Sequence, residues 1–351
     1  PQDESMFERK NLEHYSETTF TATMEFWREW IEHSTYKGRW REIVHRSAIT
    51  LKMMTSLQHG STIAAATFSL PETLGGDRNW DYRYTWIRDA AFTMYAFLRL
   101  GFTEESKAFL AWLMERCKDM KTASDLQLMY AVDGETKLEE KELKHMEGYF
   151  GSSPVRIGNA AYKQFQLDIY GELIDTIYLY NKHGGPITYE FWKNICLFVD
   201  YVIENWQRKD HGIWEVRHEQ KDFLYSKMMC WVALDRAILI ARDRSFPAPL
   251  GEWQKVRDTI YKEIFENYWD EDRQAFVQYK GSKVLDASVL LMTLARILSP
   301  HEPRWKSTLK AIEEHLVSDS LVYRYLQKDG AADGFDSEEG TFSLCSFWYI
   351  E

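Results

Sequence analysis

The stretch "YSKMMCWVALDRAILIARD", residues 225–243, is apolar on most faces of a helix, which predicts burial on all sides. Residues 250–270 instead carry one apolar stripe with charged residues opposite. That stripe consists of Trp253, Val256, Ile260, Ile264 and Tyr268. Helices buried all round that alternate with half-exposed ones are typical of two concentric helical layers. The pattern therefore predicts an inner ring of helices covered by an outer ring.

Helical periodicity and breaker residues extend this pattern along the chain. The predicted helices after residue 39 are 40–56, 85–101, 103–119, 160–183, 189–206, 221–244, 250–270, 286–299, 303–318 and 341–351. Short β-like pieces lie between them without a βαβ rhythm, which disfavours a doubly wound sheet. We predict an all-α fold, an (α/α)6 toroid of helical hairpins, with long loops at one end. A full toroid has twelve helices, so about ten indicate an incomplete ring.

Composition limits the function classes. Of the 351 residues, 15% are aromatic, and the net charge of −11 disfavours a nucleic-acid partner. No apolar run reaches the roughly 20 residues that span a bilayer, and the first residues have no signal pattern, so we expect a cytoplasmic protein without membrane contact. The four cysteines lie far apart without a metal-binding spacing, so we predict no metal and no cofactor.

The stretch "GGDRNWDYRYTWIRDAA", residues 75–91, crowds aromatic and charged side chains at the mouth of a predicted buried helix. Sugars stack on aromatic rings, and their hydroxyl pairs bind carboxylates and guanidinium groups. Tyr82, Trp86, Arg88 and Asp89 supply all three groups at a helix end that points into the ring. An aromatic plug with an Arg–Asp ion pair remains an equal alternative.

Glu215 follows Trp214 in the stretch "DHGIWEVRHEQ", residues 210–220. A carboxyl group packed against an indole is poorly solvated, which favours its neutral form and suits a general acid. The alternative interpretation is a solvated glutamate paired with Arg217.

Two further stretches carry polar side chains next to predicted helices. Arg156 and Asn159 precede the helix at 160–183, where Asn159 also suits a helix cap. Glu338 and Glu339 precede the last helix, where acidic residues are favoured by the helix dipole even without a function.

Taken together, these stretches resemble glycoside hydrolase family 15, the group of glucoamylases, glucodextranases and α,α-trehalases, and most closely its bacterial and archaeal branch. The resemblance covers residues 26–351. Its phrases occur in family order: "YTWIRDA", "GSSPVRIGNAA", "GIWE" followed by "YSKMMCWVALDRA", "LDAS", "LVYRY" and "EGTFSLCSFW".

The resemblance implies an inverting, exo-acting hydrolase that releases β-glucose from the non-reducing end of an α-glucoside or oligosaccharide. It implies that Glu215 is the general acid and that Arg88 and Asp89 hold the hydroxyls of the terminal glucose. Tyr82 and Trp86 match aromatic walls of the same subsite, and we expect Trp214 to bind the substrate as well. Arg156 and Asn159 align with the next binding loop, and Glu339 enters the last helix on the binding side.

The sequence also departs from the family. Fungal members read "WEE" where this chain has Trp214-Glu215-Val216, which leaves open whether the substrate is trehalose or of the maltose or isomaltose type. The family's catalytic base lies on a loop before the final helices, in a phrase like "GLLSEE", which we expect beyond Glu351. We therefore expect residues 1–39 to form a leading linker-helix region and residues 40–351 a catalytic domain truncated at its C-terminal end.

Three interpretations of this truncated chain stay open. It is the core of an active enzyme, a non-catalytic fragment that binds glucose or α-glucan, or a toroidal interaction scaffold. An incomplete ring also exposes apolar flanks, so we expect a homo-oligomer.

Overall fold

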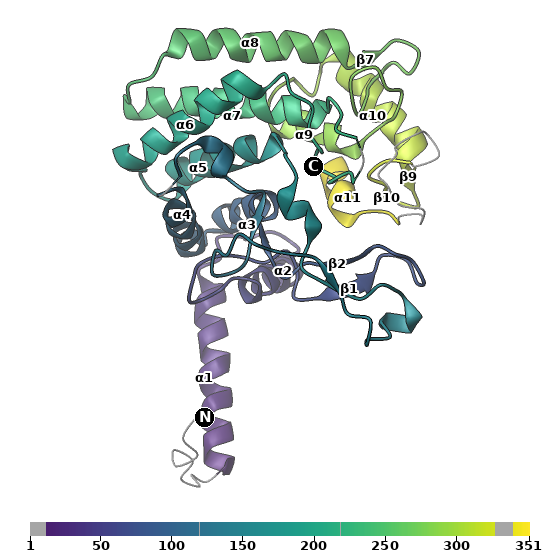
Figure 1. Cartoon of the computed structure of the whole chain (residues 1–351). Helices are drawn as coiled ribbons and strands as arrows, with labels where there is room; N and C mark the ends of the chain where they lie inside the picture. The colour runs from purple at the N-terminus through teal and green to yellow at the C-terminus, as the bar shows by residue number, and fades with distance from the viewer. Residues whose placement is uncertain (1–11, 119, 218, 327–339) are drawn as a thin grey trace.

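The computed structural model describes residues 12–118, 120–217, 219–326 and 340–351. Helices form most of the secondary structure (Figure 1). The α-helices are α1 (Leu12–Glu32), α2 (Arg41–Met53), α3 (Ile87–Leu100), α4 (Thr103–Cys117), α5 (Asp168–His183), α6 (Tyr189–Asn205), α7 (Leu224–Arg244), α8 (Leu250–Asn267), α9 (Leu291–Leu294), α10 (Pro303–Leu316) and α11 (Ser343–Ile350). Four of the short 3-10 turns are η2 (Ala123–Asp125), η3 (Tyr149–Gly151), η4 (Ala160–Lys163) and η5 (Ala287–Leu290).

The helices form the two layers that the hydrophobic pattern predicts. Helix α5 packs between α3 and α7, and α7 packs against η5, which contacts α11. The rings of Phe92 on α3 and Trp348 on α11 lie 5.8 Å apart, which brings the last described helix back against the first inner one. Helices α4, α6, α8 and α10 contact these inner elements or their connections from outside. This alternation is that of an (α/α)6 toroid.

In the described part of the chain, the strands form five two-stranded antiparallel sheets, none of which builds a layer of its own. They are β1 (Phe68–Pro71) with β2 (Asn79–Asp81), β3 (Thr85–Trp86) with β4 (Met129–Tyr130), β5 (Lys141–Glu142) with β6 (Arg156–Ile157), β7 (Trp269–Asp270) with β8 (Ala275–Phe276), and β9 (Val317–Ser318) with β10 (Leu321–Val322). Figure 1 shows β1 and β2 in a loop region at the lower right, below the helical body.

Two predicted helices are shorter than the sequence pattern indicates. The segment 160–183 begins as the turn η4, continues as an extended stretch and becomes helical only at Asp168. The segment 286–299 consists of η5 and the single turn α9, and Arg296 then takes a left-handed backbone with φ of 62°. In both places a polar side chain caps a 3-10 turn, because Asn159 accepts the N–H of Ala161 and Asp286 accepts the N–H of Ser288.

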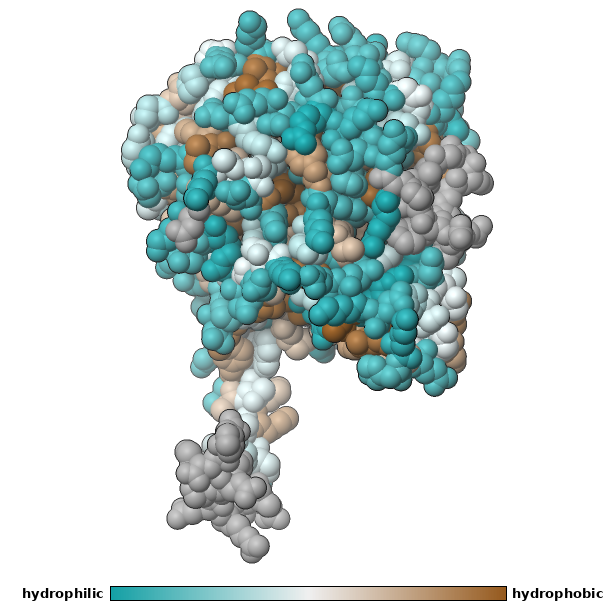
Figure 2. Space-filling model, in the orientation of Figure 1, coloured by the Kyte–Doolittle hydropathy of each residue, from teal (hydrophilic) through white to brown (hydrophobic). Residues whose placement is uncertain are grey.

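Helix α1 projects from the body as a single rod (Figure 1). Most of the face in Figure 2 is hydrophilic, with hydrophobic residues gathered in small patches. Exposed apolar side chains include Phe20 on α1 and Phe347 and Ile350 on α11, the last 75% exposed. The expected self-association through such flanks stays a prediction. Among the described residues, no helix combines the length and the apolar character needed to cross a membrane.

The contact between α5 and α7 is the centre of the core. Gly171 on α5 lies so close to α7 that a Cβ atom there would be 2.2 Å from the carbonyl oxygen of Met229. The next residue of α5, Glu172, is also buried and accepts a hydrogen bond from the hydroxyl of Tyr225 on α7. Burial, reinforced by the nearby Asp168, raises the pKa of Glu172 to about 8. The two inner helices therefore meet through a close backbone approach and a buried acid.

We predict that Gly171→Ala lowers the free energy of unfolding by about 1–3 kcal/mol, because the added methyl group meets backbone that cannot rotate away. Gly251→Ala is the matched control, since that helical glycine has open space around its Cβ position. The control raises stability by up to about 1 kcal/mol through helix propensity. Urea unfolding of the three proteins measures both effects. Equal stability of the two variants would contradict the close contact.

Glu172 makes stability depend on pH. Its folded pKa of about 8 lies above the ordinary 4.5, so between these values the folded state holds a proton that the unfolded chain releases. This contribution is complete below about pH 4.5 and is lost as the pH rises through about 8. We predict that Glu172→Gln becomes more stable relative to the unsubstituted protein as the pH rises from 5 to 8, by up to about 1.4 kcal/mol per pH unit.

Urea unfolding at several pH values measures this difference. Glu190→Gln on the outer helix α6 is the control, because the Glu190 side chain is 77% exposed. Its stability curve runs parallel to that of the unsubstituted protein. A parallel curve for Glu172→Gln as well would mean that Glu172 is ionised in the folded state.

Candidate active site

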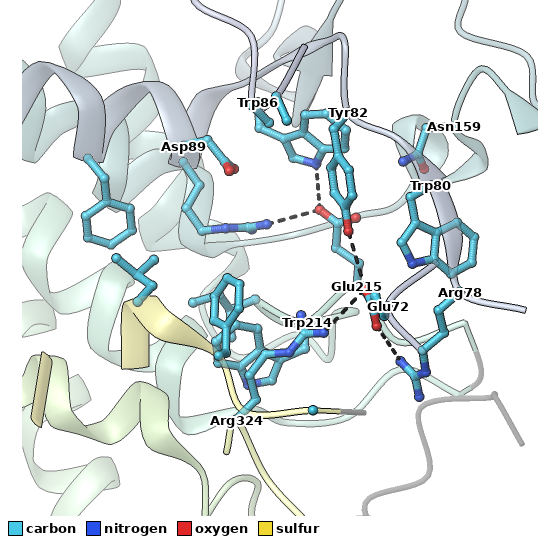
Figure 3. Close-up of a pocket in the computed structure, with 18 of the residues that line it drawn as sticks. Glu72, Arg78, Trp80, Tyr82, Trp86, Asp89, Asn159, Trp214, Glu215 and Arg324 are labelled. Atoms are coloured by element: carbon cyan, nitrogen blue, oxygen red, sulfur yellow. Dashed lines mark hydrogen bonds and ion pairs between the residues drawn. The ribbon is translucent and has the colours of Figure 1, made fainter. Parts of the chain in front are cut away.

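A cavity of about 540 Å³ opens in front of the inner helices, a volume in the range of small-ligand sites. Loops that precede α3 and α7 meet there with the start of α11 (Figure 3). The lining residues are Ala64, Ala65, Glu72, Arg78, Trp80, Tyr82, Trp86, Arg88, Asp89, Phe92, Asn159, Ile213, Trp214, Glu215, Arg217, Arg324, Gly340, Thr341, Phe342, Leu344 and Trp348. Segments far apart in the sequence thus share one hollow.

The carboxyl group of Glu215 projects into this cavity and is held by two donors. Trp86 Nε1 donates to Glu215 Oε1 at 2.8 Å, and Arg88 Nη2 donates to the same oxygen at 3.1 Å (Figure 3). No described residue donates a hydrogen bond to Oε2. The backbone of Glu215 is left-handed, with φ of 56°, which costs about 1–2 kcal/mol in a residue with a Cβ atom. The acid is therefore fixed in an unfavourable backbone conformation with one oxygen left for a ligand.

The indole beside Glu215 is that of Trp86, which is more than a hundred positions away in the chain. The expected partner, the adjacent Trp214, does not make this contact. Trp214 Nε1 instead donates to both carboxylate oxygens of Asp286, at 3.1 and 2.9 Å. The left-handed backbone at Glu215 turns neighbouring side chains in different directions. The ion pair expected as an alternative does not form either, because Arg217 pairs with Glu140 at 3.0 Å.

Arg88 connects Glu215 to a fully buried carboxylate. Its Nη1 lies 3.3 Å from Asp168 Oδ2, at the first residue of α5, and donates to Gln166 Oε1 at 3.1 Å. Burial by itself lowers the pKa of Arg88, but attraction to Asp168 and Glu215 outweighs it and raises the pKa above its ordinary value. Burial also raises the pKa of Asp168, against the opposing effect of Arg88. The guanidinium is therefore a permanent positive charge between two acids.

Asp89 follows Arg88 in the first turn of α3 and lines the same cavity. Burial raises the pKa of Asp89. Its side chain forms no ion pair or hydrogen bond with another described side chain, so its oxygens are available to a ligand. Across the cavity, the ring of Trp214 lies edge-on to Phe342, with centroids 6.0 Å apart, and the guanidinium of Arg324 lies 5.1 Å from the Trp214 centroid. An available carboxylate thus shares the hollow with aromatic walls.

A second polar group at the cavity, which the sequence analysis missed, is centred on Glu72. The hydroxyl of Tyr82 donates to Glu72 Oε1 at 3.3 Å, and Arg324 Nη2 lies 3.9 Å from that oxygen. Arg78 Nη1 lies 4.0 Å from Glu72 Oε2 (Figure 3). Burial, with the nearby Glu72, raises the pKa of Tyr82 above its ordinary value. Arg78 lies within the stretch 75–91 and Arg324 within "LVYRY", so both had a signal in the sequence.

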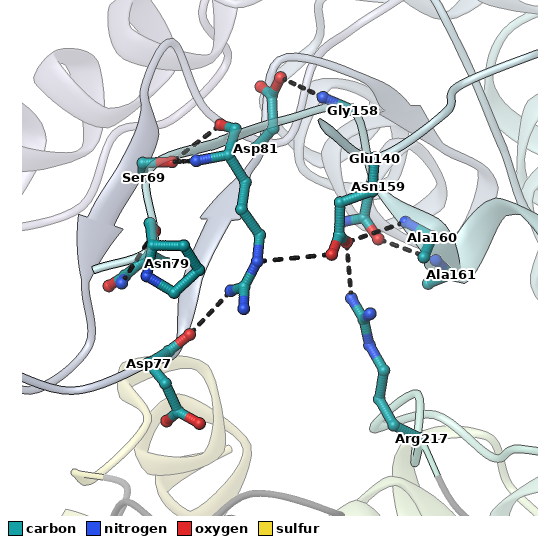
Figure 4. A network of polar contacts seen from close by, with 12 residues as sticks. Ser69, Asp77, Asn79, Asp81, Glu140, Gly158, Asn159, Ala160, Ala161 and Arg217 are labelled. Atoms are coloured by element: carbon teal, nitrogen blue, oxygen red, sulfur yellow. Dashed lines mark hydrogen bonds and ion pairs between the residues drawn. The ribbon is translucent and has the colours of Figure 1, made fainter. Parts of the chain in front are cut away.

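Arg156 does not line the cavity, whereas Asn159 does. Arg156 lies behind Trp80, with its guanidinium 4.9 Å from the ring centroid, and donates to the backbone oxygen of Asp77 at 2.8 Å. Its Nε atom lies 3.4 Å from Glu140, the same carboxylate that Arg217 contacts (Figure 4). Asn159 Oδ1 caps η4 by accepting the N–H of Ala161 at 3.0 Å. These residues support the wall that Trp80 presents to the cavity.

Glu338 and Glu339 lie outside the described residues. Within the described part of the chain, no group of three or more His, Cys, Asp or Glu side chains is arranged to hold a metal ion. The remaining predicted side chains, namely Tyr82, Trp86, Arg88, Asp89, Asn159, Trp214 and Glu215, all line one cavity.

Comparison with known proteins gives relatives of one family. The sequence profile of "Glycosyl hydrolases family 15" matches residues 38–351. A trehalase from Mycobacterium tuberculosis is 42% identical over 93% of this chain and 48% of its own length. A trehalase from Thermoplasma acidophilum is 38% identical over 94% of this chain and 55% of its own length. The chain thus spans about half the length of these curated relatives.

Solved structures agree on the fold. A bacterial glucoamylase complexed with acarbose superposes with a TM-score of 0.71 at 16% identity, over 92% of this chain and 48% of that chain. A glycosidase variant in complex with glucose gives a TM-score of 0.64 at 21% identity, over 88% and 76% of the two chains. The profile match across nearly the whole sequence, together with relatives at this level of identity, establishes that the chain belongs to glycosyl hydrolase family 15.

Proposed function

We propose that this chain forms the glucose-binding and acid-donating part of an inverting, exo-acting α-glucoside hydrolase whose substrate is α,α-trehalose. The observation that carries the proposal is the Glu215 carboxyl, fixed through Oε1 by Trp86 and Arg88 with Oε2 left toward the cavity. A general acid needs this combination of fixed position and one accessible oxygen.

Glu215 is the proton donor in this proposal. A proton on Oε2 passes to the glycosidic oxygen as the bond from that oxygen to the anomeric carbon breaks. The electron pair of the broken bond stays on the leaving oxygen, which departs as a hydroxyl group. Trp86 and Arg88 then stabilise the carboxylate that remains, because both already donate to Oε1.

Asp89 binds the hydroxyls of the terminal glucose. A carboxylate without another side-chain partner can accept two O–H bonds from neighbouring sugar hydroxyls. Trp86 and Trp214 supply apolar walls of the same hollow. Arg88 has its two terminal nitrogens committed to Gln166, Asp168 and Glu215, so its main task is to hold the acid, and contact with a sugar hydroxyl is secondary.

The opposite face of the glucose needs a base that activates water, with the two carboxyl groups about 6.5–9.5 Å apart. Among the described residues, Asp89 and Glu72 are the other carboxylates that line the cavity. We assign the base role to neither, because Asp89 binds hydroxyls and Glu72 is committed to Tyr82 and Arg324. The family resemblance implies a base in a phrase like "GLLSEE", which residues 1–351 do not contain.

The trehalase relatives support trehalose over maltose-type or isomaltose-type substrates. Inversion at one anomeric carbon of α,α-trehalose yields one β-glucose, while the departing glucose keeps its α configuration. We predict that proton NMR of the first turnovers shows α- and β-glucose in equal amounts, with trehalose hydrolysed at least about tenfold more efficiently than maltose. Initial release of α-glucose alone would indicate retention. Sugar binding without any glucose release would favour the non-catalytic alternative.

We predict that Glu215→Gln in the protein that carries this chain lowers kcat on trehalose by at least about 100-fold, because the amide cannot donate an acidic proton. Glucose binding, measured by calorimetry, stays close to that of the unsubstituted protein, since the amide keeps the shape of the side chain. Full turnover in this variant would exclude Glu215 as the acid.

Asp89→Ala tests sugar binding, whereas Glu215→Gln tests proton transfer. Loss of a carboxylate that accepts sugar hydroxyls weakens glucose binding by about 10–100-fold, equivalent to roughly 1.5–3 kcal/mol. Calorimetric titration with glucose measures this change. Unaltered affinity would mean that Asp89 does not contact the sugar.

A further inference from the structure

The left-handed backbone of Glu215 is held by an interaction that the proposed chemistry does not use. The side-chain amide of Gln164 donates from Nε2 to the carbonyl oxygen of Glu215 at 3.1 Å and to that of Val216 at 3.2 Å. An amide NH₂ group has two hydrogens, one for each carbonyl. Gln164 therefore clamps the two peptide oxygens that follow the unfavourable φ angle.

The segment around Gln164 grips the same loop at two more points. The carbonyl oxygen of Phe165 accepts the N–H of His211 at 3.1 Å. The N–H of Leu167 donates to Asp210 Oδ2 at 2.9 Å. Residues 164–167 thus run along the loop 210–216 immediately before α5 begins. This use of the segment explains why it is extended although its sequence continues the helical pattern.

The clamp is also joined to the carboxyl end of Glu215. Gln164 Oε1 accepts from Gln166 Nε2 at 3.1 Å, and Gln166 Oε1 accepts from Arg88 Nη1 at 3.1 Å. Arg88 Nη2 then donates to Glu215 Oε1. The four side chains form a closed circuit that holds Glu215 at its carbonyl and at its carboxylate. The circuit also fixes the orientation of the Gln164 amide, because each end of that amide has a different partner.

We propose that Gln164 is a positioning residue for the acid: its amide holds the Glu215–Val216 backbone so that the Glu215 carboxyl stays against Trp86 and Arg88. The inference rests on the proposed role of Glu215. Gln164 is absent from the cavity lining, so it acts on the substrate through the side chains that it holds and not by direct contact.

Gln164→Met tests this inference, because methionine keeps the length of the side chain and removes both donors. Gln274→Met is the matched control. Gln274 Nε2 also donates to a backbone carbonyl, that of Glu271 at 2.9 Å, and Gln274 itself has a left-handed φ of 50°. That turn joins β7 to β8 and contributes nothing to the cavity.

The activity of the protein that carries this chain is measured on trehalose and on α-glucosyl fluoride. The fluoride leaves as an anion with little need for a proton. We expect Gln164→Met to lower kcat on trehalose by about 10–100-fold with a small change in KM. The decrease in kcat of Gln164→Met on the fluoride is several times smaller than on trehalose. Gln274→Met keeps the kcat of the unsubstituted protein on both substrates. Equal losses on the two substrates, or no loss on trehalose, would overturn the positioning role.

Hydrogen exchange provides a readout that needs no activity. The N–H groups of Glu215 and Val216 bond to Gly212 and His211 within the same loop. We expect peptides covering 212–217 to exchange at least about tenfold faster in Gln164→Met and unchanged in Gln274→Met. Unchanged exchange in both variants would show that Gln164 does not hold this loop. If the unsubstituted protein hydrolyses neither substrate, the proposed function fails, and exchange alone decides whether Gln164 holds the loop.

Discussion

The guanidinium of Arg88 lies between two carboxylates, Asp168 beneath it and Glu215 in the cavity, and the candidate site depends on this arrangement. Buried charges are tolerated only when they are paired and hydrogen-bonded. Asp168 is wholly buried and the Arg88 side chain is 12% exposed, so neither charge is stable there without the other. Because Arg88 lies in the first turn of α3 and Asp168 is the first residue of α5, the ion pair also fixes the ends of two inner helices relative to each other. The same group that anchors the core therefore orients the acid.

The helical ring explains how residues more than a hundred positions apart reach one carboxyl group. Trp86 and Arg88 come from the strand and helix at the first inner position, and Glu215 comes from the loop before α7. Helix α5, between α3 and α7, contributes Asp168 and the preceding segment with Gln164 and Gln166. The inner helices are rigid supports, and their connecting loops carry the chemistry.

Sequence patterns predicted the fold well, because buried and half-buried helices differ in the number of apolar faces. The helix expected at 189–206 is α6, and the one expected at 103–119 is α4. Patterns failed where side chains bond to distant backbone, as in the extended segment before Asp168. For the site, local sequence and family resemblance identified the residues around "WIRD" and "IWE" that line the cavity. They could not show that Asp168 and Gln164 support the site, or that the Trp86 indole contacts Glu215, because these contacts depend on how separate loops converge.

The central claim is that a glucose unit lies in the cavity with its glycosidic oxygen at Glu215. A crystal structure of the Glu215→Gln variant soaked with trehalose tests this most directly. The account predicts one glucose ring between Trp86 and Trp214, hydroxyls on the Asp89 carboxylate, and the glycosidic oxygen within hydrogen-bonding distance of residue 215. Trehalose bound elsewhere, or in this cavity with its glycosidic oxygen turned away from residue 215, would contradict it.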